Sequence, residues 1–153
     1  MIIDLHRLAP DGETFEGEEP AHVWALEQDA DVKAEQPIRY RIHVFLVSGE
    51  LLAKGNLESS VSFRCSRCGE FAVRHLKEPA FECAIEVDSA MTHVDLTGEI
   101  REAMLLNFPS FPLCRKNCRG LCTQCGKNLN EGACDCSPPN EQRWEALDGL
   151  SLN

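Results

Sequence analysis

Cysteine is the residue type through which this sequence can do chemistry, and its spacing is regular. Nine cysteines occur among 153 residues, and eight of them form four close pairs. Two pairs are knuckles of the form C-x2-C-G, namely Cys65-Ser66-Arg67-Cys68-Gly69 and Cys122-Thr123-Gln124-Cys125-Gly126. The other two pairs are Cys114 with Cys118 and Cys134 with Cys136. Four thiolates hold zinc in a closed tetrahedral site, and glycine permits the positive-φ turn of a knuckle, so we expect two structural zinc ions.

The spacing leaves open how the eight ligands divide between the sites. In the arrangement that we favour, the last four cysteines close a compact local cage, and the knuckle at 65–68 joins the pair at 114 and 118. A zinc-ribbon arrangement would instead join the two knuckles and leave the other two pairs for the second ion. A single site with spare thiols is a third arrangement. Cys83 is left over in all of them, and we expect it to be a core thiol on the inward face of a strand.

The sequence offers no enzyme active site. Its five histidines are scattered, and it lacks a Gly-rich phosphate loop and the H-E-x-x-H and G-x-S-x-G motifs. A catalytic zinc needs an open coordination position, whereas four cysteine pairs make closed sites. We therefore expect the cysteine pairs to form structural rather than catalytic sites. Knuckles of this kind also hold a single iron, so a rubredoxin-like iron or thiol redox protein is an alternative, as is a zinc-stabilised protein-interaction module.

Charge is distributed unevenly along the chain. The formal net charge is −10, and residues 1–36 contribute −8 of it through ten acids and two bases. Residues 113–130 carry four bases and no acid, and a second basic stretch at 64–77 also contains cysteines. The four bases are Arg115, Lys116, Arg119 and Lys127. They offset thiolate charge, form a face for RNA phosphate, or do both, although so acidic a chain is not a general nucleic-acid coat.

Alternating hydrophobicity predicts a twisted antiparallel sheet over residues 38–88, with a turn at Ser48-Gly49 and a bend near Gly55. A first strand is expected at 2–8. The acidic stretch 10–20, with its prolines and glycines, is expected to be a loop or poorly ordered. After the sheet, apolar residues at helical spacing predict a helix capped by Asp95 or Thr97 and stopped by Pro109.

These elements predict an α+β fold, in which a twisted antiparallel β-sheet carries one or two packed helices and a cysteine-rich, zinc-binding C-terminal segment. Residues 1–36 form an acidic N-terminal segment with the first strand and a loop, and residues 37–111 form the sheet and helix. Residues 112–137 form the cysteine-rich segment, and residues 138–153 a short C-terminal helix or tail around Trp144. No apolar run is long enough to span a membrane, and the start does not have the pattern of a secretory signal.

The cysteine motifs resemble a known family. The first cysteine knuckle ends a hairpin. The segment Val94-Asp95-Leu96 and a helix follow it. After the helix comes the run Pro112-Leu113-Cys114-x3-Cys118-Arg119-Gly120-Leu121-Cys122-x2-Cys125-Gly126-Lys127-Asn128-Leu129-Asn130, with Cys134-x-Cys136. This pattern is similar to that of the YceD family of bacterial and plastid proteins, described as large-subunit ribosomal RNA accumulation proteins. The likeness is specific over residues 60–136 and general before them.

The resemblance implies a cytoplasmic, non-enzymatic ribosome biogenesis factor. It would support the synthesis, processing or accumulation of 23S rRNA by binding pre-ribosomal RNA or a ribosomal protein. Because the basic residues lie on the loops that zinc would order, the RNA-binding reading of Arg115, Lys116, Arg119 and Lys127 fits this implied function.

Overall fold

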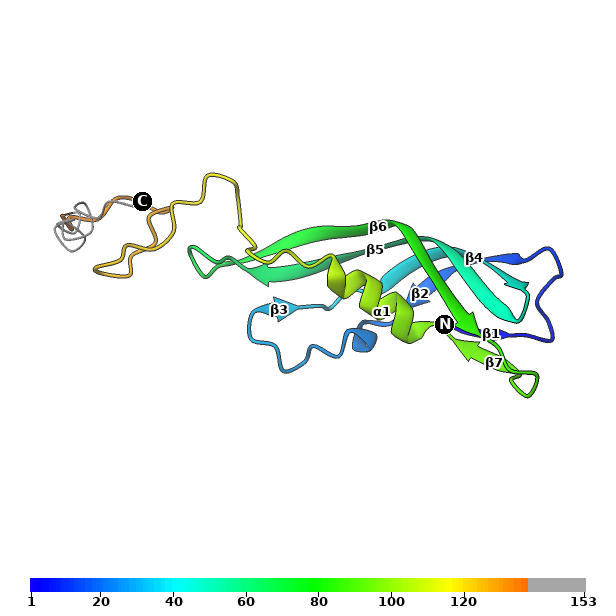
Figure 1. The fold of residues 1–153 in the computed structure, drawn as a ribbon. Coiled ribbons are helices and arrows are strands. Elements are labelled where there is room, and N and C mark those ends of the chain that lie inside the picture. The colour runs from blue at the N-terminus through cyan, green and yellow to red at the C-terminus, as the bar shows by residue number, and fades with distance from the viewer. Residues whose placement is uncertain (138–153) are drawn as a thin grey trace, which may run out of the picture.

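The computed structural model describes residues 1–137 as a long, twisted sheet with one helix packed along it (Figure 1). Beyond one end of the sheet, residues 112–137 continue without regular strands or helices (Figure 1). The elements in chain order are β1 (Ile2–Asp4), β2 (Glu13–Glu19), the 3-10 helix η1 (Ala21–Trp24), β3 (Val32–Lys33), β4 (Ile38–Val47), β5 (Glu50–Arg64), β6 (Phe71–Glu86), β7 (His93–Asp95) and α1 (Thr97–Leu106).

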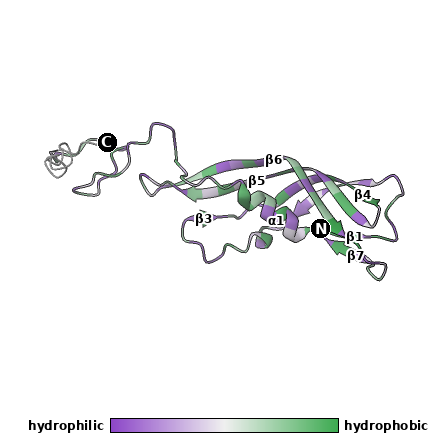
Figure 2. Ribbon diagram, in the orientation of Figure 1, coloured by the Kyte–Doolittle hydropathy of each residue, from purple (hydrophilic) through white to green (hydrophobic). Residues whose placement is uncertain are grey.

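The antiparallel meander β4-β5-β6 confirms the sheet that the alternation predicts. Inward residues of β4 and β5 such as Ile42, Val44 and Val61 are fully buried, whereas their sequence neighbours face water. Figure 2 shows the matching alternation of hydrophobic and hydrophilic bands along β5 and β6. The predicted turn at Ser48-Gly49 has φ values of 52° and 86°, the positive pair that a tight two-residue hairpin needs. The long β5–β6 hairpin carries the first cysteine knuckle at its far end.

The prediction that residues 10–20 form a loop is wrong for most of the stretch, because Glu13–Glu19 forms β2 and pairs antiparallel with β4. The acidic side chains of β2 meet bases of β4, with Glu16 3.0 Å from Arg41 and Glu18 2.8 Å from Arg39. Gly17 belongs to a strand rather than to a turn. A Cβ atom there would lie 2.6 Å from the Tyr40 hydroxyl, so the missing side chain makes room for the tyrosine ring.

The first strand is shorter than predicted. Only Ile2–Asp4 pairs, with β7, and the chain then turns through a hydrogen bond from the Arg7 N–H to the Asp4 carbonyl. The C-terminal helix predicted around Trp144 lies outside the described residues. Within residues 1–137, no helix is long and apolar enough to cross a membrane.

Helix α1 covers the inner face of the sheet and confirms the predicted helix. The N-cap residue is Leu96, and the Asp95 carboxylate just before it accepts hydrogen bonds from the Thr97 N–H (2.9 Å) and hydroxyl (2.6 Å), which lower the Asp95 pKa. Ile100 and Met104 are fully buried against the sheet. The helix ends at Leu106, and the following Phe108 packs edge-on against Phe63 at 4.9 Å between ring centroids. This aromatic contact fixes where the chain leaves the core toward the second pair of cysteines.

Gly55 gives a test of the sheet packing. A Cβ atom at this position would lie 2.1 Å from the Arg41 carbonyl oxygen and 2.7 Å from the Ile42 Cα of the neighbouring strand. Gly55→Ala should therefore force β4 and β5 apart and cost roughly 1–3 kcal/mol of unfolding free energy, measured by urea denaturation. Gly98→Ala is the control, because nothing lies within 4 Å of its added Cβ and alanine favours a helix. Equal urea midpoints for the two variants would contradict this account.

Candidate metal centres

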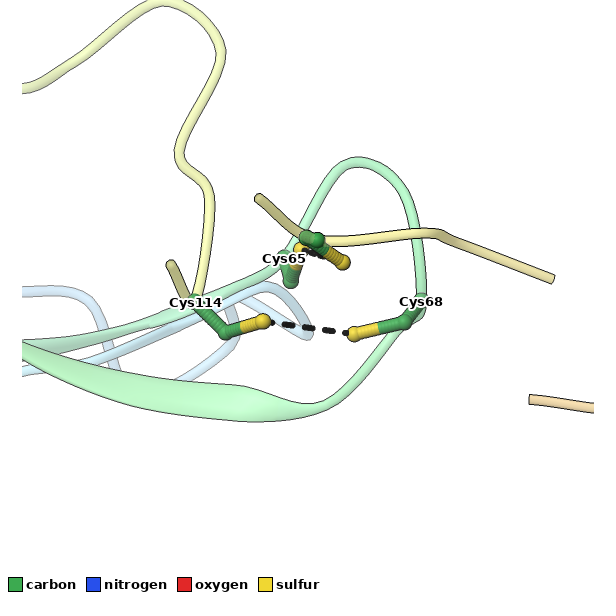
Figure 3. A group of neighbouring side chains, drawn as sticks. Cys65, Cys68 and Cys114 are labelled. Carbon is green, nitrogen blue, oxygen red and sulfur yellow. Dashed lines mark hydrogen bonds between the residues drawn. The ribbon is translucent and has the colours of Figure 1, made fainter. Parts of the chain in front are cut away.

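The first group of cysteines joins the end of the β5–β6 hairpin to the chain after α1. Cys65 and Cys68 lie between β5 and β6, while Cys114 and Cys118 come from the segment that follows the helix. All four Sγ atoms lie within 4.8 Å of one another. The sulfur–sulfur distance is 3.8 Å from Cys65 to Cys118 and 3.7 Å from Cys68 to Cys114 (Figure 3). Sulfurs bound at about 2.3 Å to a tetrahedral zinc ion are about 3.8 Å apart, so the geometry fits such an ion.

The second group is local in sequence. Its sulfurs also lie within 4.8 Å of one another, and they belong to Cys122, Cys125, Cys134 and Cys136. The first group is largely buried, whereas the second is partly exposed. The structure thus brings the thiols together in the first of the arrangements considered from the sequence and separates the two knuckles. Ligation by these eight residues, the number of ions bound and the choice of zinc stay predictions.

Both knuckles are built by the same backbone hydrogen bonds, which explains the shared C-x2-C-G pattern. In the first, the Gly69 N–H donates to the Cys65 carbonyl at 2.9 Å, and in the second, the Gly126 N–H donates to the Cys122 carbonyl at 2.9 Å. The two glycines have φ values of 76° and 74°, which glycine adopts without a steric penalty. Inside each knuckle a backbone N–H also points at the first sulfur, from Arg67 at 3.5 Å and from Gln124 at 3.4 Å.

These N–H groups act on the thiol pKa values. Burial opposes ionisation of Cys65, but hydrogen bonds from backbone N–H groups outweigh burial and lower its pKa to about 6. The N–H groups of Cys125 and Gln124 lower the Cys122 pKa to about 6. Hydrogen bonds with the Cys125 thiol, together with burial, raise the Cys136 pKa to about 12. One thiolate in each group is therefore favoured by the protein alone, and a divalent cation is needed to hold four together.

Asn130 connects the two groups, although it lies in the loop of the second. Its side-chain amide donates to the Cys118 sulfur at 3.3 Å, and its side-chain oxygen accepts from the Arg119 N–H at 2.9 Å and from the Arg115 guanidinium at 2.8 Å. The strand-like contact at Gly120 adds to this link, because the Leu129 N–H donates to the Gly120 carbonyl at 2.9 Å. The loop of the second group thus supports a ligand of the first.

The chain from Cys118 to Leu121 is also fixed on its other side. The Arg67 guanidinium donates to the Cys118 carbonyl at 3.0 Å, and the Leu121 N–H donates to the Arg67 carbonyl at 3.1 Å. Gly120 has a φ of 77°, and a Cβ there would lie 3.1 Å from the Arg67 carbonyl oxygen. Arg67 belongs to the basic stretch at 64–77, so the sequence carried a signal for it. The role of Asn130 depends on contacts across the fold and has no such signal.

Cys83 lies apart from both groups, on β6. It is half-buried and packs against the main core, and burial together with the nearby Glu99 raises its pKa to about 11. A neutral thiol in this position behaves as a small apolar side chain, as the alternation of the strand indicates.

The predicted RNA-binding cations are all exposed on the loops that the two groups close. The Lys127 ammonium donates to the Ala133 carbonyl at 2.7 Å, and Arg115 is held by Asn130. Lys116 lines a groove beside β6, and the side chains of Lys116 and Arg119 have no ion-pair partner within residues 1–137.

The fold and the two centres define a β-sheet protein with two four-cysteine clusters of the structural metal type. Residues 77–151 match the family model described as "Large ribosomal RNA subunit accumulation protein YceD". This match agrees with the resemblance that the cysteine motifs show to the same family.

Two plant relatives carry the name of the same family, and a bacterial relative is uncharacterised. The chain is 26% identical over 103 residues to a protein of Zea mays named "Large ribosomal RNA subunit accumulation protein YCED homolog 1, chloroplastic", covering 67% of this chain and 33% of the relative. The Arabidopsis thaliana protein of the same name is 21% identical over 140 residues, 65% of this chain and 44% of the relative. An uncharacterised protein of Mycobacterium leprae is 30% identical over 108 residues, 61% of this chain and 49% of the relative. The chain thus spans a third to a half of the length of these relatives. No solved structure matches.

The grouping of the sulfurs predicts how metal is lost from variants. Cys122→Ser/Cys125→Ser should lose one of two bound ions and keep the other. Cys65→Ser/Cys68→Ser should lose the other ion and also free residues 112–137 from the sheet, seen as faster limited proteolysis. Metal per chain is measured by elemental analysis, with Cys83→Ala as a control that keeps both ions. Full metal content in either double variant would show that its cysteines are not ligands.

The link through Asn130 predicts that a residue of the second loop controls the first ion. Asn130→Ala removes the hydrogen bond to the Cys118 sulfur and should weaken metal retention at the first centre about 10- to 100-fold. Metal release is followed by competition with a chromogenic chelator. The kinetic phase of release from the first centre is identified as the phase that is missing in the Cys65→Ser/Cys68→Ser variant. The exposed Asn117→Ala is the matched control. Wild-type release from Asn130→Ala would disprove the link.

Proposed function

We propose that the protein is a non-enzymatic, cytoplasmic ribosome biogenesis factor of a bacterium, which supports 23S rRNA synthesis, processing or accumulation. It acts by binding pre-ribosomal RNA, and two zinc ions order the segment that makes the contact. Residues 37–111 are the scaffold in this proposal, and residues 112–137 are the binding segment. One observation carries it, namely that exposed cations stand on the acid-free loop 113–130 between the two cysteine clusters.

The cations of the sheet form ion pairs within the protein, and their difference from the loop cations supports an external partner for the latter. On the outer face of the sheet, Arg39, Arg41 and Lys54 each lie within 3.0 Å of a glutamate carboxylate. Such pairs satisfy the charges within the protein. The side chains of Lys116 and Arg119 have no carboxylate partner within the described residues, so they are available to phosphate groups.

The contacts of the sulfurs argue against a purely local role for the cations. Within residues 1–137, hydrogen bonds to cysteine sulfur from outside the clusters come from backbone N–H groups and from the Asn130 amide. The Arg115 and Lys127 side chains donate instead to an asparagine oxygen and a backbone carbonyl. Counter-charge for thiolates would place cationic groups against the sulfurs. A loop already ordered by metal loses little entropy when it binds phosphate, which favours the RNA-binding reading.

A ribosomal protein is the second candidate partner, and the acidic residues of the N-terminal third are what favour it. Two of these acids, Glu16 and Glu18, are taken up in ion pairs with β4, which leaves fewer for a basic protein. The identity of the bound metal tests the separate alternative that the protein is a redox protein. A colourless, zinc-containing preparation would exclude the iron carrier, whereas a red iron-containing one would exclude our assignment.

Neutralising the loop tests direct RNA binding. Arg115→Gln/Lys116→Gln/Arg119→Gln should weaken binding to single-stranded segments of 23S rRNA at least 10-fold. It should also reduce the slope of log K against log salt concentration by up to about 2, because each phosphate contact contributes about 0.7. The matched control is Arg39→Gln/Arg41→Gln/Lys54→Gln, which removes three cations that are paired with glutamates on the outer face of the sheet. Equal losses in the two variants would show that the loop is not the binding face.

The target of the protein is found by crosslinking in cells followed by sequencing of the bound RNA. The proposal requires reads concentrated in one stretch of the large-subunit RNA, in wild type and not in the loop variant. Recovery of ribosomal proteins without RNA would replace it by the protein-binding alternative.

A further inference from the structure

A groove lies beside the segment that links α1 to the first cysteine group. It has a volume of about 390 Å³. Its apolar wall consists of Leu76 from β6 and of Pro109, Pro112 and Leu113 from the linking segment. The lining is completed by Phe111 and by the polar or charged residues Arg74, His75, Asn107 and Lys116, and no carboxylate contributes to it.

Phe111 is the most unusual residue of this groove. Its side chain is 82% exposed, whereas the other six phenylalanines of the chain are all at least partly buried. An aromatic ring left in water loses the free energy that burial would provide, about 25 cal/mol for each Å² of apolar surface. The fold thus leaves this ring uncovered, although a core is available only three residues away at Phe108.

The exposed ring is carried by a fixed segment. On one side Phe108 packs against Phe63, and on the other the Ser66 N–H donates to the Pro112 carbonyl at 2.8 Å. The Arg74 guanidinium donates to the Leu113 carbonyl. Prolines at 109 and 112 restrict the backbone further. A ring held in this way can accept a planar ligand without first being ordered, which lowers the cost of binding.

The lining matches one chemical class of ligand. An aromatic face at the mouth, apolar walls and two cations without a lining carboxylate suit a planar ring that carries an anionic group, as a nucleotide does. Arg115 and Arg119 lie close to Lys116 in the sequence, so the positive charge extends beyond the groove. This extension suits the repeated phosphates of a nucleic-acid strand better than the single charges of an acidic peptide.

We propose that this groove binds one unstacked nucleotide of single-stranded RNA, with its base stacked on Phe111 and its phosphate against Lys116 and Arg74. The inference rests on the proposed function and deepens it by naming the form of RNA that is bound. It assigns to Phe111 a specificity role that charge alone does not provide, because stacking requires a base free of its duplex.

The test compares Phe111→Ala and Phe111→Trp on the full, metal-loaded chain. The probes are single-stranded oligoadenylate and oligouridylate of twelve nucleotides and a duplex of equal length. Phe111→Ala should weaken oligoadenylate binding about 10-fold or more and leave the salt slope unchanged, whereas Phe111→Trp should retain the affinity. Leu106→Ala is the control, since that side chain is 79% exposed but lies outside the groove lining.

The outcomes separate this inference from the proposed function. Wild-type affinity in Phe111→Ala, combined with a loss in the charge-neutralised loop variant, would overturn the stacked nucleotide and leave RNA binding intact. Equal affinity of wild type for duplex and single strand would also overturn it. If the wild-type chain binds none of the three RNAs, the proposed function fails and the groove proposal fails with it. Binding of an acidic aromatic peptide, lost in Phe111→Ala and without RNA binding, would assign the groove to a protein partner.

Discussion

The closure of the first cysteine group is the interaction on which the rest of the candidate site depends. It joins the tip of the β5–β6 hairpin to the chain after α1, across 46 to 53 residues of sequence. The segment beyond it has almost no apolar core of its own, since Leu113 and the cysteines themselves make up the small second cluster of buried side chains. A segment of this size cannot bury enough surface to fold alone, so the proposed metal–thiolate bonds would supply the stability that packing does not.

The two centres form a hierarchy rather than two independent sites. The second group closes a local loop, but that loop carries Asn130 back to the Cys118 sulfur and pairs with the chain at Gly120. Arg67 holds the same chain from the hairpin side. The segment from Cys118 to Leu121 is therefore fixed between both cysteine groups, and opening either group would remove one of its two supports. The orientation of the neighbouring cations follows from the same contacts.

Local signals in the sequence were sufficient to predict the sheet, its tight turn and the helix, and to identify Cys83 as the cysteine that lies outside both groups. They failed where the decisive contact is distant. The strand β2 contains glycine and four acids, which is typical of a loop, and only the bases of β4 and the ring of Tyr40 make it a strand. In the same way, spacing defined the cysteine pairs but not which pairs share an ion. The hairpin and the contact of Phe108 with Phe63 decide that, because they bring Cys114 beside Cys68.

The charges of the metal centres make short-range contacts important for any RNA partner. A zinc ion with four thiolates carries a net charge of about −2, so two such centres equal in magnitude the four cations of the loop 113–130. The chain as a whole carries −10. At long range the chain as a whole therefore repels a polyanion, and nonspecific binding to RNA is disfavoured. Affinity must come from fixed cations that reach individual phosphates and from contacts that do not depend on net charge. In the proposed complex, an exposed aromatic ring on a rigid segment beside those cations would provide a contact of the second kind, and it would also restrict the partner to RNA whose bases are unpaired.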